Sequence, residues 1–131
     1  MKHSNGNILN YLKLIRYPNL IIIAFTQIIV KYFVINKLFN STVNDTEFSL
    51  LMLAVLLIAG AGYAINDYFD IRIDRINKPD KVLINKHIPR RNAIIIHAVF
   101  NITAVLITLY LSYKIRSLTF VAVILFMIAS L

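Results

Sequence analysis

Two long stretches of the chain carry no charged side chain, and each is long enough to cross a membrane as a helix. Residues 48–66 form 19 consecutive uncharged positions, and residues 92–113 form 22. An α-helix rises about 1.5 Å per residue, so the shorter stretch spans about 28 Å, close to the ~30 Å hydrocarbon core of a bilayer. The pattern predicts transmembrane helices over about 48–66 and 92–113.

Two further apolar stretches flank these segments, and each departs from the simple pattern. Residues 17–30 are uncharged, Lys31 interrupts them, and five uncharged residues follow before Lys37. A lysine near the end of a span can extend its ammonium group to the headgroups, so we expect a helix over about 18–36 with Lys31 snorkelling. Residues 117–131 predict a fourth apolar helix, but its 15 residues rise only about 22 Å, short of the hydrocarbon core. We therefore expect the chain to be a truncated product or a fragment.

The composition agrees with a membrane protein and excludes other classes. The chain is 59% hydrophobic and 15% charged, with a mean hydropathy of +0.71, whereas soluble domains are about half apolar and a quarter charged. It has no cysteine, which excludes disulfides, thiolate metal sites and a cysteine nucleophile. A net charge of +8 on so apolar a chain indicates a lipid bilayer rather than a nucleic acid as partner. We expect an all-α, polytopic transmembrane helix bundle of about four helices.

The basic residues are distributed unevenly between the two sides of such a bundle. Ten of the fourteen fall on one side when the spans alternate, namely Lys2, Lys13, Arg16, Arg72, Arg75, Lys78, Lys81, Lys86, Arg90 and Arg91. The positive-inside rule places this side in the cytoplasm. The sequence thus predicts a multi-pass protein of the cell inner membrane, with its N-terminus and its 66–92 connection cytoplasmic.

Acidic residues gather where the second predicted span ends. Asn66, Asp70 and Asp74 stand at i, i+4 and i+8. Asp67 precedes Asp70 by three positions, so a helix that continues past the membrane boundary brings all four side chains to one face. Clustered oxygen ligands suit Mg²⁺, which bridges carboxylates to phosphates. Nearby cations that can bind the same phosphates are Arg72, Arg75, Lys78 and Lys81. A solvated face with alternating ion pairs is the alternative, and the spacing leaves both interpretations open.

A longer ordered pattern surrounds these residues. The chain reads Asn66-Asp67-x-x-Asp70-x-x-x-Asp74, followed by Arg75-x-Asn77-Lys78-Pro79, and it begins with the segment Leu12-Lys13-Leu14-Ile15-Arg16-Tyr17-Pro18-Asn19. The first pattern resembles the first aspartate-rich motif of the UbiA superfamily of intramembrane prenyltransferases, and the second resembles the family's N-terminal segment. Within the family the chain is most similar to the branch of geranylgeranylglycerol-phosphate geranylgeranyltransferases and their bacterial relatives.

The resemblance implies a reaction and a set of site residues. It implies Mg²⁺-dependent transfer of a prenyl group from a prenyl diphosphate to a lipid-soluble acceptor, either aromatic or of the glycerol-phosphate type. The implied metal ligands are Asn66, Asp67, Asp70 and Asp74, with the three aspartates as catalytic residues. The implied diphosphate contacts are Asn66, Arg16, Arg72, Lys78 and Lys81, and Asn19 is the implied acceptor contact. From position alone, Arg16 and Asn19 are equally consistent with anchoring at the membrane surface.

The family pattern is longer than this chain. Members carry nine helices and a second aspartate-rich motif, whereas no acidic residue follows Asp80 here. The resemblance therefore implies that residues 1–131 are the N-terminal part of a larger prenyltransferase membrane domain. We expect no prenyl transfer by this chain alone.

Two other functions compete with prenyl transfer. A CDP-alcohol phosphotransferase also uses aspartates at the membrane boundary, but its Asp-Gly pair does not occur in this chain. A non-enzymatic membrane protein with a cation-binding acidic loop is the second alternative.

Two other patterns predict packing rather than chemistry. His97 and Asn101, at i and i+4, predict a hydrogen-bonded pair between helices, and Gly60-Ala61-Gly62 predicts a close helix contact.

Overall fold

The computed structural model describes residues 7–38, 44–77, 82–116 and 118–129. This part of the chain is helical apart from short connections and an isolated bridge between Ile84 and Ile88. The elements are α1 (Ile8–Leu14), α2 (Tyr17–Ile29), the π-helix η1 (Val30–Ile35), α3 (Asn36–Leu38), α4 (Asp45–Phe69), α5 (Ile71–Asn77), α6 (Arg90–Ile115) and α7 (Thr119–Ala129). The expected all-α membrane bundle is confirmed.

Three helical segments are long and apolar enough to cross a membrane. They are Tyr17–Ile35, Asp45–Phe69 and Arg90–Ile115, which match the spans predicted over 18–36, 48–66 and 92–113. The fourth apolar segment contains α7, whose 11 residues rise only about 16 Å, so α7 is not a full span within the described residues.

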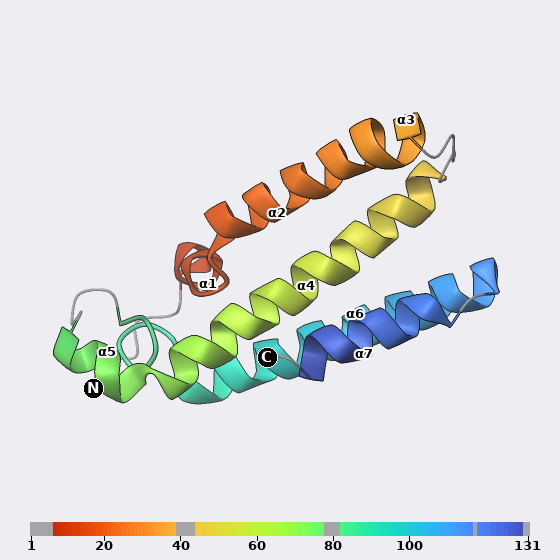
Figure 1. Cartoon of the computed structure of the whole chain (residues 1–131). Helices are drawn as coiled ribbons and strands as arrows, with labels where there is room; N and C mark the ends of the chain where they lie inside the picture. The colour runs from red at the N-terminus through yellow and green to blue at the C-terminus, as the bar shows by residue number, and fades with distance from the viewer. Residues whose placement is uncertain (1–6, 39–43, 78–81, 117, 130–131) are drawn as a thin grey trace.

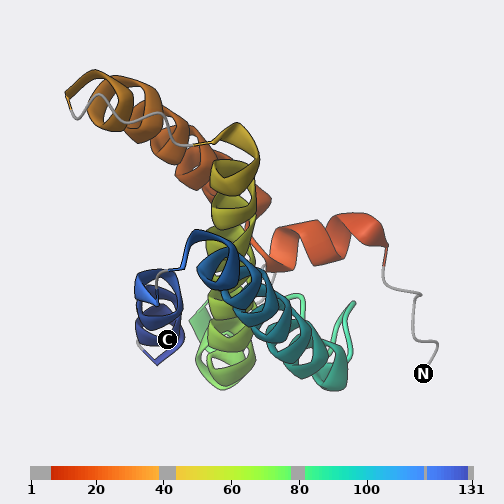
Figure 2. The same ribbon diagram turned by 90° about the vertical axis from the view of Figure 1, so that its right-hand side faces the viewer.

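The long helices pack around α4, which runs through the centre of the bundle. Figure 1 shows α2 on one side of α4 and α6 on the other, with α7 folded back along α6. Figure 2 shows that α2 diverges from α6 and α7, and among the long helices it contacts α4 alone. We call the two ends of the bundle the α5 end, where α1, α5 and the 82–89 loop meet, and the α3 end, where α4 begins and α6 turns into α7 (Figure 1).

Small residues on α4 allow its neighbours to approach closely. The buried positions of this helix are Ala54, Ile58, Gly60, Ala61, Gly62 and Ala64. A Cβ atom added at Gly60 would lie 3.2 Å from the Phe100 ring and 3.6 Å from Cβ of Ile15. Because helices in a bilayer associate through such close packing, the prediction of a tight helix contact at Gly60 is confirmed.

Gly60→Ala is expected to lower the free energy of unfolding by about 1 kcal/mol, because the crowding of the added Cβ against the edge of the Phe100 ring outweighs the gain of about 1 kcal/mol that alanine has over glycine inside a helix. In a Phe100→Leu background that ring edge is absent, so the same substitution should raise the free energy of unfolding by about 1 kcal/mol. Equilibrium unfolding of the four proteins in mixed detergent micelles measures the coupling between the two positions. Costs that simply add would contradict the contact.

Lys31 does not extend to the headgroups as the sequence suggested. Its side chain is buried within η1 and forms an ion pair with Asp45, at the start of α4. Its ammonium nitrogen also lies 4.6 Å from the centre of the Phe48 ring. The expectation of snorkelling is therefore wrong, because a carboxylate and an aromatic face from α4 give the cation an internal partner.

A second ion pair links α4 to α6 at the same α3 end. Nζ of Lys114 lies 3.2 Å from Oε1 of Glu47. Asp45 and Glu47, both in the first turn of α4, thus join this helix to η1 on one side and to α6 on the other.

Candidate active site

The acidic residues lie at the α5 end, where α4 passes into α5. The regular helix is interrupted at Asp70, but the backbone hydrogen bonds continue across the interruption: Asp70 N donates to Asn66 O at 2.9 Å, and Asp74 N donates to Asp70 O at 2.8 Å. This i to i+4 register keeps Asn66, Asp70 and Asp74 in one axial row. The helical register on which the predicted shared face depends therefore continues across the break for Asn66, Asp70 and Asp74.

Asp67 is joined to the α1–α2 junction by Arg16. Nη2 of Arg16 donates to Oδ1 of Asp67 at 2.9 Å, with the Arg16 side chain 49% exposed and the Asp67 side chain 23% exposed. The guanidinium also stacks 5.1 Å from the centre of the Tyr63 ring. The hydroxyl of Tyr63 accepts a hydrogen bond from Nδ2 of Asn19 at 3.4 Å. Residues 51 positions apart are thereby brought to one site.

Local backbone geometry directs Arg16 toward α4. Arg16 has φ 53° and ψ 54°, a left-handed conformation that ends α1 and begins α2, and its carbonyl accepts the first backbone bond of α2, from Asn19 N at 2.8 Å. Pro18, in the first turn of α2, needs no hydrogen-bond acceptor for its nitrogen. Leu14 is fully buried and fixes α1 against the core, so the left-handed turn sets the position of the Arg16 side chain.

The acidic residues follow one helix face and do not form a closed metal cage. Within the described ranges, no group of three or more His, Cys, Asp or Glu side chains is placed to hold a metal ion together. Mg²⁺, however, is commonly bound through one or two carboxylates, with waters and substrate phosphates as its remaining ligands. Asp70 is exposed and Asp74 partly so, and the charges of both act on Asp67. This donor set fits a metal that takes its other ligands from a bound diphosphate.

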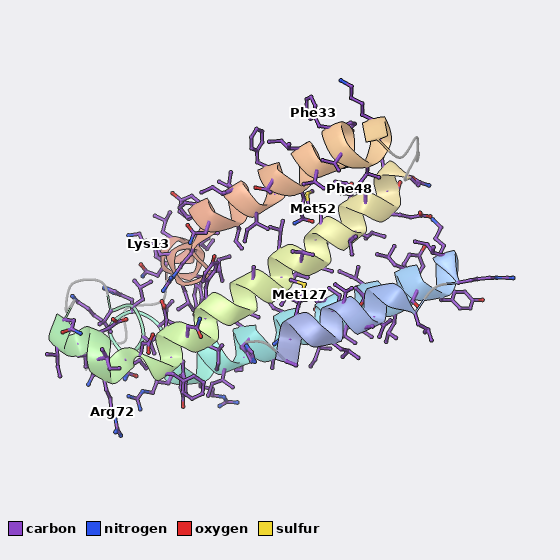
Figure 3. All side chains as sticks on the ribbon, viewed as in Figure 1. Lys13, Phe33, Phe48, Met52, Arg72 and Met127 are labelled. Carbon is purple, nitrogen blue, oxygen red and sulfur yellow. The ribbon has the colours of Figure 1, made fainter. Side chains whose placement is uncertain are left out.

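Of the other residues expected at the diphosphate, Asn66 is exposed and lies in the row that also carries Asp70. Arg72 is exposed and extends away from the bundle, on the side opposite to α1 in Figure 3, because two residues along a helix turn a side chain about 200° from Asp70. Lys78 and Lys81 lie outside the described residues.

Tyr63 is a member of this site that the sequence reasoning missed. It contacts both predicted ligand-binding residues of the N-terminal segment, Arg16 and Asn19. The sequence signal for Tyr63 was its position four residues before Asp67, which places both side chains on the same face of α4.

His97 and Asn101 form the predicted internal polar pair. Nδ1 of His97 lies 3.2 Å from the carbonyl oxygen of Ala61 on α4, and Nδ2 of Asn101 lies 3.2 Å from Nε2 of His97. The pair connects α6 to α4, which is the packing role expected for it.

Comparisons with known proteins agree on one family. Residues 27–130 match the UbiA prenyltransferase family. The chain is 42% identical over 85 residues to a digeranylgeranylglyceryl phosphate synthase of Methanosarcina barkeri, covering 59% of this chain and 29% of the relative. Proteins of the same name from Methanosarcina mazei and Metallosphaera sedula are each 34% identical, covering 68% and 87% of this chain and 34% and 40% of the relatives. The chain thus spans about a third of the length of these relatives. No solved structure is significantly similar to it.

Proposed function

Because the chain belongs to the UbiA prenyltransferase family, we propose that it supplies the diphosphate-binding part of an integral membrane prenyltransferase. The axial row of Asn66, Asp70 and Asp74, which we call the acidic row after its two aspartates, would hold Mg²⁺ on the diphosphate of a prenyl donor together with Asp67. The observation that carries the proposal is the pairing of Arg16 with Asp67 beside this row, because it joins a phosphate-binding cation to the carboxylates at the membrane boundary.

Arg16 has the chemistry to pass from a carboxylate to a phosphate. A partly exposed ion pair contributes only about 0–1 kcal/mol, so an arriving diphosphate can displace Asp67 from the guanidinium at low cost. The planar guanidinium then donates two parallel hydrogen bonds to phosphate oxygens. Asp67, freed from Arg16, would then be available with Asp70 and Asp74 as an oxygen ligand for Mg²⁺.

Prenyl transfer requires that the allylic carbon–oxygen bond break and that the acceptor, not water, capture the carbon. Bound Mg²⁺ would supply neutralisation of the negative charge that develops on the leaving diphosphate. The Arg16 guanidinium adds to this neutralisation, and its contact with the Tyr63 ring holds the guanidinium in place. Apolar surfaces of α2, α4 and α6 keep the membrane side of the site dry, which protects an allylic cation from water.

The proposed acceptor is a glycerol-phosphate lipid. All three relatives described above are named digeranylgeranylglyceryl phosphate synthase, which favours this acceptor over an aromatic one. The family also favours prenyl transfer over a CDP-alcohol phosphotransferase or a non-enzymatic cation-binding protein. We further propose that the protein lies in the cell inner membrane with its α5 end cytoplasmic, since that end carries most of the basic residues.

Metal removal tests the proposed donor site directly on this chain. In lipid nanodiscs with 1 mM Mg²⁺, the chain is expected to bind geranylgeranyl diphosphate at least tenfold more tightly than with EDTA, because the carboxylates repel the diphosphate unless a cation lies between them. Isothermal titration calorimetry measures both affinities. Geranylgeraniol, which lacks phosphate, is the control and should show no metal dependence. Equal affinity for the diphosphate with and without metal would contradict the proposal.

A further inference from the structure

Two arginines outside the acidic row converge on one neutral oxygen. In the amide orientation of Asn85 that satisfies its neighbours, its side-chain oxygen accepts from Nε of Arg90 at 2.9 Å and from Nη2 of Arg75 at 3.3 Å. Arg75 belongs to α5 and Arg90 is the first residue of α6. The contact therefore joins two helices through the loop between them.

The loop that carries Asn85 is built to present this oxygen. Asn85 has φ 68°, a left-handed conformation, and its N–H donates to the carbonyl of Ile88 at 2.8 Å. The N–H of Ile88 in turn donates to the carbonyl of Leu83 at 3.0 Å. Ile84 and Ile88, on either side of the turn, are each only 1% exposed and anchor it in the core. A tight turn with two buried anchors fixes the amide in position.

Arg75 and Arg90 form no ion pair with the described residues. The ion pairs among them join Arg16 to Asp67, Lys31 to Asp45 and Lys114 to Glu47, and none involves Arg75 or Arg90. A neutral amide oxygen offsets two adjacent guanidinium charges only weakly. Each guanidinium has five N–H donors, and the contact with Asn85 uses one of each. Both side chains belong to exposed residues, so the remaining donors can reach an anion.

The same buried cluster supports this pair of arginines and the acidic site. Ile84 and Ile88 of the loop pack in one core cluster with Leu14, Ala64, Ile71 and Ala93. Leu14 lies two residues before Arg16, and Ala64 lies three residues before Asp67. The arginine pair is thus at the α5 end, on the scaffold that positions the proposed donor site. Arg75 follows Asp74 directly on α5, whereas Asn85 and Arg90 belong to the loop and to α6, which carry none of the acidic residues of the donor site.

We infer that Arg75 and Arg90, positioned by Asn85, bind the phosphate monoester of the glycerol-phosphate lipid acceptor. This inference rests on the proposed function and assigns the acceptor's headgroup to a site separate from that of the diphosphate. A phosphate dianion offers the charge and the several acceptor oxygens that two forked guanidinium groups require. Asn85 is a positioning residue, since it holds the two arginines together when no anion is bound.

The test measures binding of a phosphate-monoester lipid to the whole chain. The chain is placed in phosphatidylcholine nanodiscs, and lysophosphatidic acid, a glycerol-phosphate lipid, is titrated in and followed by native mass spectrometry. Arg75→Gln and Arg90→Gln are each expected to weaken binding about tenfold, because a charge-assisted contact to phosphate is lost. Arg72→Gln is the control: it removes one positive charge from α5, the helix that also carries Arg75, but from a side chain that extends away from the bundle (Figure 3). It should change the affinity less than twofold.

Two further measurements separate this site from its alternatives. Asn85→Gly keeps the left-handed turn but removes the amide oxygen, so it should weaken lysophosphatidic acid binding while leaving the helical circular dichroism unchanged. Mg²⁺-dependent binding of inorganic pyrophosphate should be the same in the wild type and in Arg90→Gln. An equal loss of lysophosphatidic acid binding in all three arginine variants would overturn the inference in favour of diffuse electrostatic attraction. A loss confined to pyrophosphate would overturn it in favour of the donor site. Selective loss of the lipid phosphate supports the inference even if the chain binds no prenyl diphosphate, which would instead count against the proposed function.

Discussion

Asp70→Asn is expected to reduce prenyl transfer at least 100-fold. The part of this chain that aligns with the Metallosphaera sedula relative, 87% of its length, would replace the matching stretch of that relative. Transfer from radiolabelled geranylgeranyl diphosphate would then be measured in membranes. Asp70 is the central member of the axial row, so its replacement removes a charged oxygen ligand from the middle of the proposed metal site. Loss of a single group that stabilises developing charge typically costs about 10²–10³ in rate.

The control for this substitution is Glu47→Gln. It removes one negative charge from the same helix, but at the opposite end, where Glu47 is paired with Lys114. Transfer by the Glu47→Gln hybrid should stay within about twofold of the parent hybrid, since a partly exposed ion pair contributes little. Manganese binding followed by electron paramagnetic resonance should fall only in the Asp70→Asn protein. Undiminished transfer by Asp70→Asn would remove the acidic row from the mechanism.

The membrane spans could be predicted because their signal is local. Uncharged stretches over 48–66 and 92–113 mark α4 and α6 to within a few residues, since a helix in lipid must be both long and apolar. The single face of Asn66, Asp70 and Asp74 was also predictable, because i to i+4 spacing is a property of the helix itself.

Contacts between distant segments could not be read from these patterns. Asp67 and Arg16 were each identified from the sequence, but their pairing depends on a left-handed residue at the α1–α2 junction, and arginine is not a typical residue for that conformation. Asn85 carried no signal of its own, because its role arises only when α5, the loop and α6 meet. Lys31 was misplaced for the same reason: its partner Asp45 belongs to the next helix.

Asp45→Asn is expected to destabilise the protein by about 3 kcal/mol, whereas Lys31→Met should cost less than about 1 kcal/mol. The asymmetry follows from burial, since the Lys31 side chain is only 2% exposed and the Asp45 side chain is 82% exposed. Removing the aspartate leaves a buried ammonium ion without its counter-charge. Removing the lysine leaves an aspartate that water can solvate, and methionine keeps a favourable contact with the Phe48 ring.

Unfolding in mixed micelles of the two single variants and the double variant measures this asymmetry. The Lys31→Met/Asp45→Asn protein should be nearly as stable as Lys31→Met alone, because the penalty of Asp45→Asn exists only while the buried charge is present. Tyr32 and Phe48 both face the ammonium, at 5.4 and 4.6 Å from their ring centres, so their attraction to it offsets part of the loss. Equal destabilisation by the two single variants would show that Lys31 reaches water or headgroups after all. A larger cost for Asp45→Asn than for Lys31→Met would instead establish that the role of Asp45 is to neutralise a cation that is buried where η1 meets α4.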